Sequence, residues 1–442
     1  MQPVSRRVCS LFLVLGLGMP FVLARTATGD DLDADPLNYR TAPTANVITR
    51  LQARLEAGQA RLEYDNEFGY LRSVLRELQV PESSQMLVFT KTSLQRHRIS
   101  PKTPRALYFN DDVYVGFCRQ GDVMEISAPD PVLGTVFYTL EQNREEKPRF
   151  VRQHDSCLLC HGSSVTQGYP GHLVRSVFAD GQGLPLLSSS TYRTDQTSPL
   201  KQRWGGWYVT GTSGSQLHMG NRIVRGRRAP ENEDNVEGSN VTDLRDRFTV
   251  GMYPTPHSDL VALMVMEHQA EMHNRIARAT LETRIALYQE ADINKALGRP
   301  EGYRSESTTS RLRYVGEPVV KYLFFSEEAQ LTEPVRGTSA FADEFPRRGP
   351  RDAKGRSLRD LDLQCRLFKH PCSYLVYSDV FDAMPTPVRE YVLRRMWEVL
   401  TGKDQSKPFA HLTPQDRTAI LEILRATKPN LPDYWREPTA TR

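Results

Sequence analysis

The apolar residues in the first part of the chain are spaced as in helices. Within residues 44–80 they recur every three or four positions: Ile48, Leu51, Leu55 and Leu62, then Leu71, Val74, Leu75 and Leu78. This spacing gives a helix one apolar face. The pattern therefore predicts two helices before Val80-Pro81, where the proline disfavours continuation.

After residue 85 the helical spacing of apolar residues gives way to short runs of residues that favour strands. Short β-prone runs occupy 86–89, 106–109, 113–118, 123–127 and 135–140. They are separated by turn-forming clusters such as Asn110-Asp111-Asp112 and Gln120-Gly121-Asp122. This arrangement predicts an antiparallel meander of about four or five strands.

Helical spacing returns in the second half. His257-Ser258-Asp259 forms a cap for a helix that we expect to run to about Tyr288. Residues 289–316 look looser, and a short helix is expected around 319–330 before a Pro/Gly/Arg-rich linker at 333–357. Two more helices are expected at about 386–401 and 414–427. The fold class is therefore α+β, with an antiparallel β-meander first and a mainly helical C-terminal half.

The N-terminus has the pattern of a secretory signal peptide. Arg6 and Arg7 precede an apolar run that ends near Ala24. We expect cleavage after Ala24 or Ala27 and a periplasmic or secreted location. The expected organisation is a signal peptide at 1–24, a flexible lead-in at 25–43, a functional region at 44–285, an irregular connection at 286–357 and a helical C-terminal unit at 358–442.

The near balance of basic and acidic residues limits the kinds of partner that the sequence suggests. The chain has 57 basic and 53 acidic residues, and removal of 1–24 takes away two arginines and no acid. A nearly neutral surface gives no reason to expect nucleic acid or an anionic membrane as partner. Since no later stretch is long and apolar enough to cross a bilayer, we expect no integral span once the signal is removed.

The most specific motif is the pentad Cys157-Leu158-Leu159-Cys160-His161. On a short helical turn, two thiols three residues apart can each reach one vinyl group of the same porphyrin, and the adjacent imidazole can face the iron. In this pentad the chain resembles the c-type cytochromes. The resemblance implies one covalently bound haem c, held by Cys157 and Cys160, with His161 as an axial ligand. Other readings are half of a zinc site that includes His154 or His172, and a redox dithiol.

The resemblance covers little more than the pentad. A small cytochrome c carries its attachment motif near the N-terminus and is almost wholly helical, whereas here more than a hundred residues, largely strand, come first. The chain therefore departs from the pattern of a small electron carrier.

Several residues could face His161 across the iron. Met219 follows His161 by 58 residues and is the first candidate for the distal ligand. His268 is the alternative, because it lies on the apolar stripe of the predicted long helix, and His218 is a lesser one. An open or water-bound iron is the remaining possibility. Trp204 and Trp207, close to glycines, could pack on a porphyrin face.

Three functions follow from these observations. The first is an exported monohaem cytochrome that carries electrons between redox protein partners. The second is a haem enzyme of peroxidase or small-molecule oxidase type with an open distal site, where His218, His268 or His172 could act as acid or base. The third is a secreted structural or binding protein whose cysteines and histidines hold zinc. Enzymatic activity is thus left open, with electron transfer preferred.

The other cysteines have simpler interpretations. Cys365 and Cys372 flank a short segment and could form a disulfide, which would stabilise the fold by roughly 2.5 kcal/mol through loop closure. Cys118 lies in a strand-like run and is expected to be a buried, inert thiol.

Overall fold

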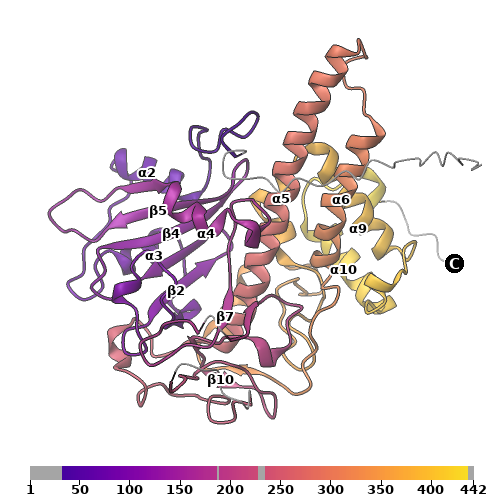
Figure 1. The fold of residues 1–442 in the computed structure, drawn as a ribbon. Helices are drawn as coiled ribbons and strands as arrows, with labels where there is room; N and C mark the ends of the chain where they lie inside the picture. The colour runs from indigo at the N-terminus through magenta and orange to yellow at the C-terminus, as the bar shows by residue number, and fades with distance from the viewer. Residues whose placement is uncertain (1–31, 187–188, 227–233, 437–442) are drawn as a thin grey trace, which may run out of the picture.

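A computed structural model describes residues 32–186, 189–226 and 234–436 (Figure 1). The predicted signal peptide, residues 1–24, lies outside the described residues, as does Ala27. The described part has an antiparallel sheet in the N-terminal half and helices mainly in the C-terminal half. The α+β class predicted from the sequence is therefore confirmed.

The sheet has seven strands and is antiparallel throughout. Its order is β6-β5-β4-β3-β2-β1-β9. The strands are β1 (Met86–Val88), β2 (Arg105–Asn110), β3 (Val113–Phe117), β4 (Val123–Asp130), β5 (Gly134–Glu141), β6 (Phe150–Gln153) and β9 (Trp207–Tyr208). The five predicted strands form its centre. The two edge strands were not predicted. Half of β6 consists of the polar residues Arg152 and Gln153, and the two residues of β9 come from a distant part of the chain.

One face of the sheet is apolar and forms part of a hydrophobic core. Along β4, Met124, Ile126 and Ala128 are buried and alternate with half-buried residues. This buried face packs with the two predicted N-terminal helices, α2 (Val47–Glu56) and α3 (Leu71–Glu77). The opposite face carries the half-buried polar residues Glu125 and Ser127 and is called the polar face below, although apolar residues such as Val88 and Phe109 on the same face join the core of α5.

The segment before α2 is packed, in contrast to the expected flexible lead-in. Leu32, Leu37 and Tyr39 are all buried in the same core. The Tyr39 hydroxyl donates a hydrogen bond to the backbone oxygen of Thr135 at 2.7 Å. The segment is mostly polar, and its three buried apolar residues are spaced too irregularly to predict a helix or a strand. Its packing therefore could not be expected from the sequence.

The longest helix is α5 (Leu260–Ala296), which starts at the predicted cap residue Asp259. It continues beyond Tyr288 because polar groups near its end have tertiary partners. Glu290 accepts hydrogen bonds from the backbone and hydroxyl of Ser305, and Asn294 donates to the backbone oxygen of Tyr303. These contacts connect α5 to α6 (Glu306–Leu323), which begins well before the predicted position near 319.

The remaining α-helices and strands lie between β6 and the end of the described chain. They are α4 (Asp155–His161), β7 (Arg175–Val177), β8 (Thr191–Arg193), β10 (Gly211–Thr212), β11 (Arg336–Gly337), α7 (Phe341–Glu344), α8 (Asp379–Asp382), α9 (Thr386–Leu400) and α10 (Pro414–Thr427). The helices α9 and α10 match the predicted ones. Figure 1 shows α5 standing between the sheet and the C-terminal helices.

The segment 333–357 differs from a free linker. Strand β11 pairs with β10, and Phe341 and Phe345 are buried in the core that α5 shares with the C-terminal helices. That core is continuous from Met86 in β1 to Trp435 near the end of the described chain. Among the described residues, no helix combines the length and the apolar character needed to cross a bilayer.

The expected disulfide is not formed. Cys365 and Cys372 are both free thiols, one exposed and one buried. Cys365 sits in a turn held by Asp362, whose carboxylate accepts the Cys365 backbone N–H at 2.9 Å, whereas Cys372 is completely buried in the core. The different surroundings of the two thiols explain why nearness in sequence did not lead to pairing. Cys118 is buried and free, as expected.

Candidate functional site

The pentad lies on the short helix α4, which directly follows the edge strand β6 (Figure 1). Asp155 in the first turn suits the positive end of a helix, and Gly162 follows the last helical residue. Leu158 packs against the sheet core, while Leu159 is 79% exposed. Leu158 and His161 thus face the protein, whereas Leu159 and Cys160 lie on the exposed side of the helix.

The two thiols of the motif are free and differ in exposure. Cys157 is half-buried and Cys160 is exposed. Burial raises the pKa of Cys157 to about 11, so this group is a neutral thiol near pH 7. Their spacing on one helical turn brings both thiols and His161 to neighbouring positions.

The protonation of His161 follows from one hydrogen bond. Its Nδ1 lies 2.9 Å from the backbone oxygen of Gly171. A carbonyl oxygen only accepts, so Nδ1 carries the proton and the neutral ring presents a lone pair at Nε2. Burial lowers the pKa of His161, which favours this neutral form. An imidazole oriented in this way by a backbone carbonyl is ready to coordinate a metal through Nε2.

The acceptor Gly171 is itself fixed by α5. The Asn274 side chain accepts the backbone N–H of His172 at 2.7 Å and donates to the backbone oxygen of the same residue at 2.8 Å. A Cβ at Gly171 would overlap Asn274 Oδ1, so only glycine allows this close approach. We call the two hydrogen bonds between the Asn274 side chain and the His172 backbone the Asn274 clamp.

The imidazole of His161 also rests on the polar face of the sheet. Its ring centroid lies 4.9 Å from that of Phe137 in β5. The register pairs Phe137 with Ser127 and Thr139 with Glu125, so these side chains share one face. The half-buried side chains of this face lie beside the motif.

A buried cluster of rings lies behind the clamp. The His172 ring lies 4.1 Å from the Tyr114 ring, and the Tyr114 hydroxyl is 3.0 Å from His273 Nδ1. Gln269 donates a hydrogen bond to the same hydroxyl. Burial lowers the pKa of His172 and brings that of His273 to about 3, so both rings are neutral near pH 7. The cluster connects the motif to α5 without adding a charge.

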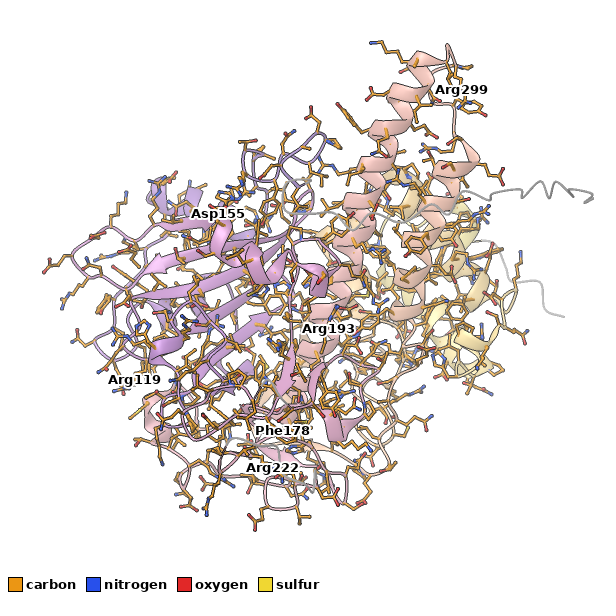
Figure 2. All side chains as sticks on the ribbon, viewed as in Figure 1. Arg119, Asp155, Phe178, Arg193, Arg222 and Arg299 are labelled. Atoms are coloured by element: carbon orange, nitrogen blue, oxygen red, sulfur yellow. The ribbon has the colours of Figure 1, made fainter. Side chains whose placement is uncertain are left out.

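The structure does not bring Met219 to the motif. Its sulfur accepts a hydrogen bond from Ser176 at 3.5 Å, and its side chain packs in a small cluster with Phe178 and Val224. Figure 2 shows Phe178 low in the molecule, well apart from Asp155 at the start of α4. His218 next to it is also buried, with its ring against Trp204 at 5.1 Å.

His268 has a complete set of other partners. Its Nδ1 is 2.6 Å from the Gln196 side-chain oxygen, and its Nε2 is 2.8 Å from the Ser373 hydroxyl. The ring stacks on Phe325 at 4.5 Å, and burial lowers the pKa of His268 to about 3. These are the surroundings of a core histidine rather than of an axial ligand.

The two tryptophans have different environments. Trp204 is completely buried in the core that contains α5. Trp207 lies in the edge strand β9 opposite Val88, and its indole N–H donates to the backbone oxygen of Arg175 at 2.9 Å. Val88 is in turn paired with Arg105, so Trp207 belongs to the polar face of the sheet that also carries Glu125.

The side chains around the motif can also be compared with the ligand set that a zinc site needs. Of the two nearby histidines, His172 has its Nε2 3.0 Å from the Ser127 hydroxyl, and the His154 ring makes an edge contact with Tyr39 at 6.4 Å. Across the residues that the structure describes, no three histidine, cysteine or acidic side chains are placed to share an ion.

The residues present fit a covalent haem. Two accessible thiols, an imidazole with a free Nε2 and a half-buried sheet face lie together. One donor on that face also lacks a partner, since Arg105 Nε is buried and unpaired among the described residues. A haem that is bound here would be held by Cys157 and Cys160 and ligated by His161.

Several of these residues could not be found from the sequence. Gly171 and Asn274 carry no motif, and the contact between Asn274 and His172 spans 102 positions. Phe137 has the alternation expected of a strand but nothing that indicates a neighbouring imidazole. Comparison of the chain with protein-family models, curated proteins and solved structures gives no match, so its function is inferred from the geometry described above.

Proposed function

We propose that the chain binds one haem c covalently through Cys157 and Cys160, with His161 as an axial ligand, and carries electrons between redox protein partners outside the cytoplasm. The observation that carries the proposal is the hydrogen bond from His161 Nδ1 to Gly171. It leaves Nε2 unprotonated beside two free thiols on the same helical turn.

Each residue has a distinct part in this function. The haem would supply a one-electron couple at its iron. The thiols of Cys157 and Cys160 hold the porphyrin, and Gly171 keeps the imidazole of His161 in the tautomer that ligates. The Asn274 clamp keeps Gly171 in place, and the signal-like pattern at residues 1–24 supports export.

A haem enzyme of peroxidase or small-molecule oxidase type is the second candidate. The observation that favours it is the placement of Met219 and His268, both of which have other partners. Neither side chain is placed to ligate a haem held by Cys157 and Cys160, so water or a small molecule could be the second ligand of such a haem.

Mass and colour together test the attachment. The chain is produced in a host with haem c maturation machinery, purified, and examined by intact mass and optical spectroscopy. We expect the mass of one haem beyond that of the processed chain, and retention of the colour after denaturation. The variant C157S/C160S should lose both, whereas the control variant C365S, which removes an exposed thiol outside the motif, should keep both.

Two outcomes would contradict the proposal. A colourless wild-type protein with no added mass would exclude haem attachment, and stoichiometric zinc in place of iron would establish the zinc interpretation. Carbon monoxide distinguishes the two haem candidates. An unchanged spectrum of the reduced protein indicates six-coordinate iron and electron transfer, whereas rapid binding indicates an open site.

A further inference from the structure

An ion pair crosses the polar face of the sheet beside the motif. Arg105 Nη2 in β2 lies 2.7 Å from Glu125 Oε2 in β4, and the side chains are 16% and 14% exposed. The other carboxylate oxygen of Glu125 accepts a hydrogen bond from the Ser93 hydroxyl at 2.9 Å. Both oxygens of Glu125 are thus engaged within a mostly buried site.

The strand between the two residues is adapted to this crossing. Gly116 in β3 pairs with Leu107 of β2 and with Glu125 of β4. A Cβ at Gly116 would overlap the guanidinium of Arg105, so glycine is required for Arg105 to reach Glu125. Glycine within a strand weakens it and often marks a close approach. A buried ion pair also contributes little net stability, since desolvation offsets the attraction. A gain in stability therefore does not account for the Arg105–Glu125 pair and for the glycine that accommodates it.

The pair lies close to the imidazole that would ligate the iron. Glu125 and Phe137 are diagonal neighbours on the same face, and the His161 ring packs on Phe137. Arg105 reaches Glu125 across Gly116 on this same face of the sheet. The strand register therefore places the two opposite charges on the face against which the His161 ring lies.

We propose that Arg105 and Glu125 form a compensating charge pair beside the haem, in which each charge cancels the effect of the other on the reduction potential. This inference rests on the proposed function. Glu125 favours the oxidised, more positive iron and Arg105 favours the reduced iron, so the intact pair leaves the two influences nearly balanced. A single unbalanced charge at this range shifts a one-electron couple by about tenfold in its equilibrium, which corresponds to about 59 mV.

The test is a spectroelectrochemical titration of the holoprotein and its variants. We expect E125Q to raise the potential, R105M to lower it, and the double variant R105M/E125Q to return close to wild type. R105K keeps the charge and should stay nearer wild type than R105M. The matched control is R54M/E77Q, which removes the pair between α2 and α3 on the opposite face of the sheet, 2.9 Å apart, and should leave the potential unchanged.

The outcomes separate this inference from the proposed function. A wild-type protein without haem overturns the proposed function itself. Holoproteins that carry haem but share one potential in all variants, or shift in the same direction for E125Q and R105M, overturn the role of the pair. If R105M does not fold, the potentials of E125Q and R105K still test whether the pair acts on the haem. A potential raised by E125Q and kept by R105K supports the role of the pair, and an unchanged potential in E125Q overturns it.

Discussion

At the scale of single residues, the site depends on a chain of contacts rather than on the motif alone. His161 is oriented by Gly171, and the segment of Gly171 is held by Asn274 on α5. Outer contacts of this kind set the tautomer and orientation of a ligating histidine. Asn274 is therefore a positioning residue for the site.

Replacement of Asn274 by alanine tests this role. N274A removes two hydrogen bonds to buried backbone groups, so we expect the unfolding free energy to fall by about 2 kcal/mol. Because the Gly171 carbonyl is then free to move, the iron–histidine stretching frequency of the holoprotein should also shift. Denaturant unfolding and resonance Raman spectroscopy measure the two effects. The half-buried Asn143, whose side chain is 3.0 Å from Glu146, provides the control variant N143A. A Raman frequency equal in N274A and wild type would contradict the positioning role.

The sequence indicates the candidate donors Cys157, Cys160 and His161 but not the residues that hold them in place. The pentad and its helical turn could be predicted because the spacing of Cys157, Cys160 and His161 has a local chemical meaning. The Asn274 clamp and the Arg105–Glu125 pair depend on strand register and on long-range packing, which one sequence does not encode locally. The candidates Met219 and His268 were chosen by spacing and by helical face, and burial with other partners explains why the structure keeps them elsewhere.

At the scale of elements, α5 is unusual in burying polar side chains along much of its length. Its apolar stripe could be predicted, but its full length could not, because Glu290 and Asn294 look like surface residues until their partners in the following segment are known. The start of α6 could not be predicted either, because Ser305 at its N-terminus is also held by a contact with Glu290. The strands of the meander were predictable because each has β-prone residues between clear turns.

The start of α5 gives a prediction at this scale. The buried carboxylate of Asp259 accepts the backbone N–H groups of Val261 and Ala262 with one oxygen, and those of Thr338 and Ser339 with the other. D259A leaves these donors unsatisfied, so we expect a loss of about 3 kcal/mol or more in unfolding free energy. The comparison is S305A at the start of α6, expected to lose about 1 kcal/mol. Equal losses in denaturant titrations of the two variants would show that Asp259 acts only as a cap.

The buried histidines of α5 give a prediction for acid stability. Burial lowers the pKa values of His268 and His273 to about 3, whereas both rings take up protons near pH 6.5 when the chain is unfolded. Below that pH the unfolded chain binds more protons, so the unfolding free energy falls as the pH drops from about 6.5 towards 3. Between pH 7 and pH 5 each histidine accounts for about 2 kcal/mol of that loss.

The variant H268Q/H273Q isolates this effect. Denaturant unfolding at pH 7, 6 and 5 should show a weaker pH dependence for the double variant than for wild type. The exposed His97 supplies the control H97Q, which should keep the wild-type dependence. If wild type and the double variant lose the same free energy on acidification, the two rings do not govern acid stability.

At the scale of the whole molecule, the sheet and the C-terminal helices share one core. Apolar side chains run without interruption from Met86 and Val88 in the sheet, through α5, to Trp435. A separate C-terminal unit was expected because the Pro/Gly/Arg-rich segment 333–357 looks like a linker. The buried Phe341 and Phe345, together with the pairing of β10 with β11, connect it to the rest.

A continuous core predicts cooperative unfolding. Trp435, near the end of the described chain, is completely buried in the core that α5 shares with the C-terminal helices, so W435A should lower stability by about 3–5 kcal/mol. We expect the midpoints from the haem absorption band and from the helical circular dichroism signal to coincide and to fall together. The control Y288A alters a side chain that is 41% exposed and should leave both midpoints near wild type. A haem band that keeps its midpoint while the helical signal moves would indicate two independent units.

The two strands at the outer edges of the sheet, β6 and β9, stand on either side of the motif in the sequence. The described parts of the stretch between them, 154–186 and 189–206, begin at one edge of the sheet and end at the opposite edge, and His161 in this stretch packs on Phe137 of the sheet. We call these residues the strap. A minimal peptide excised around the pentad would lack both anchors and the surface beneath it. The smallest portion of this chain that could be grafted into another protein with its chemistry intact is therefore the whole sheet together with its strap and α5.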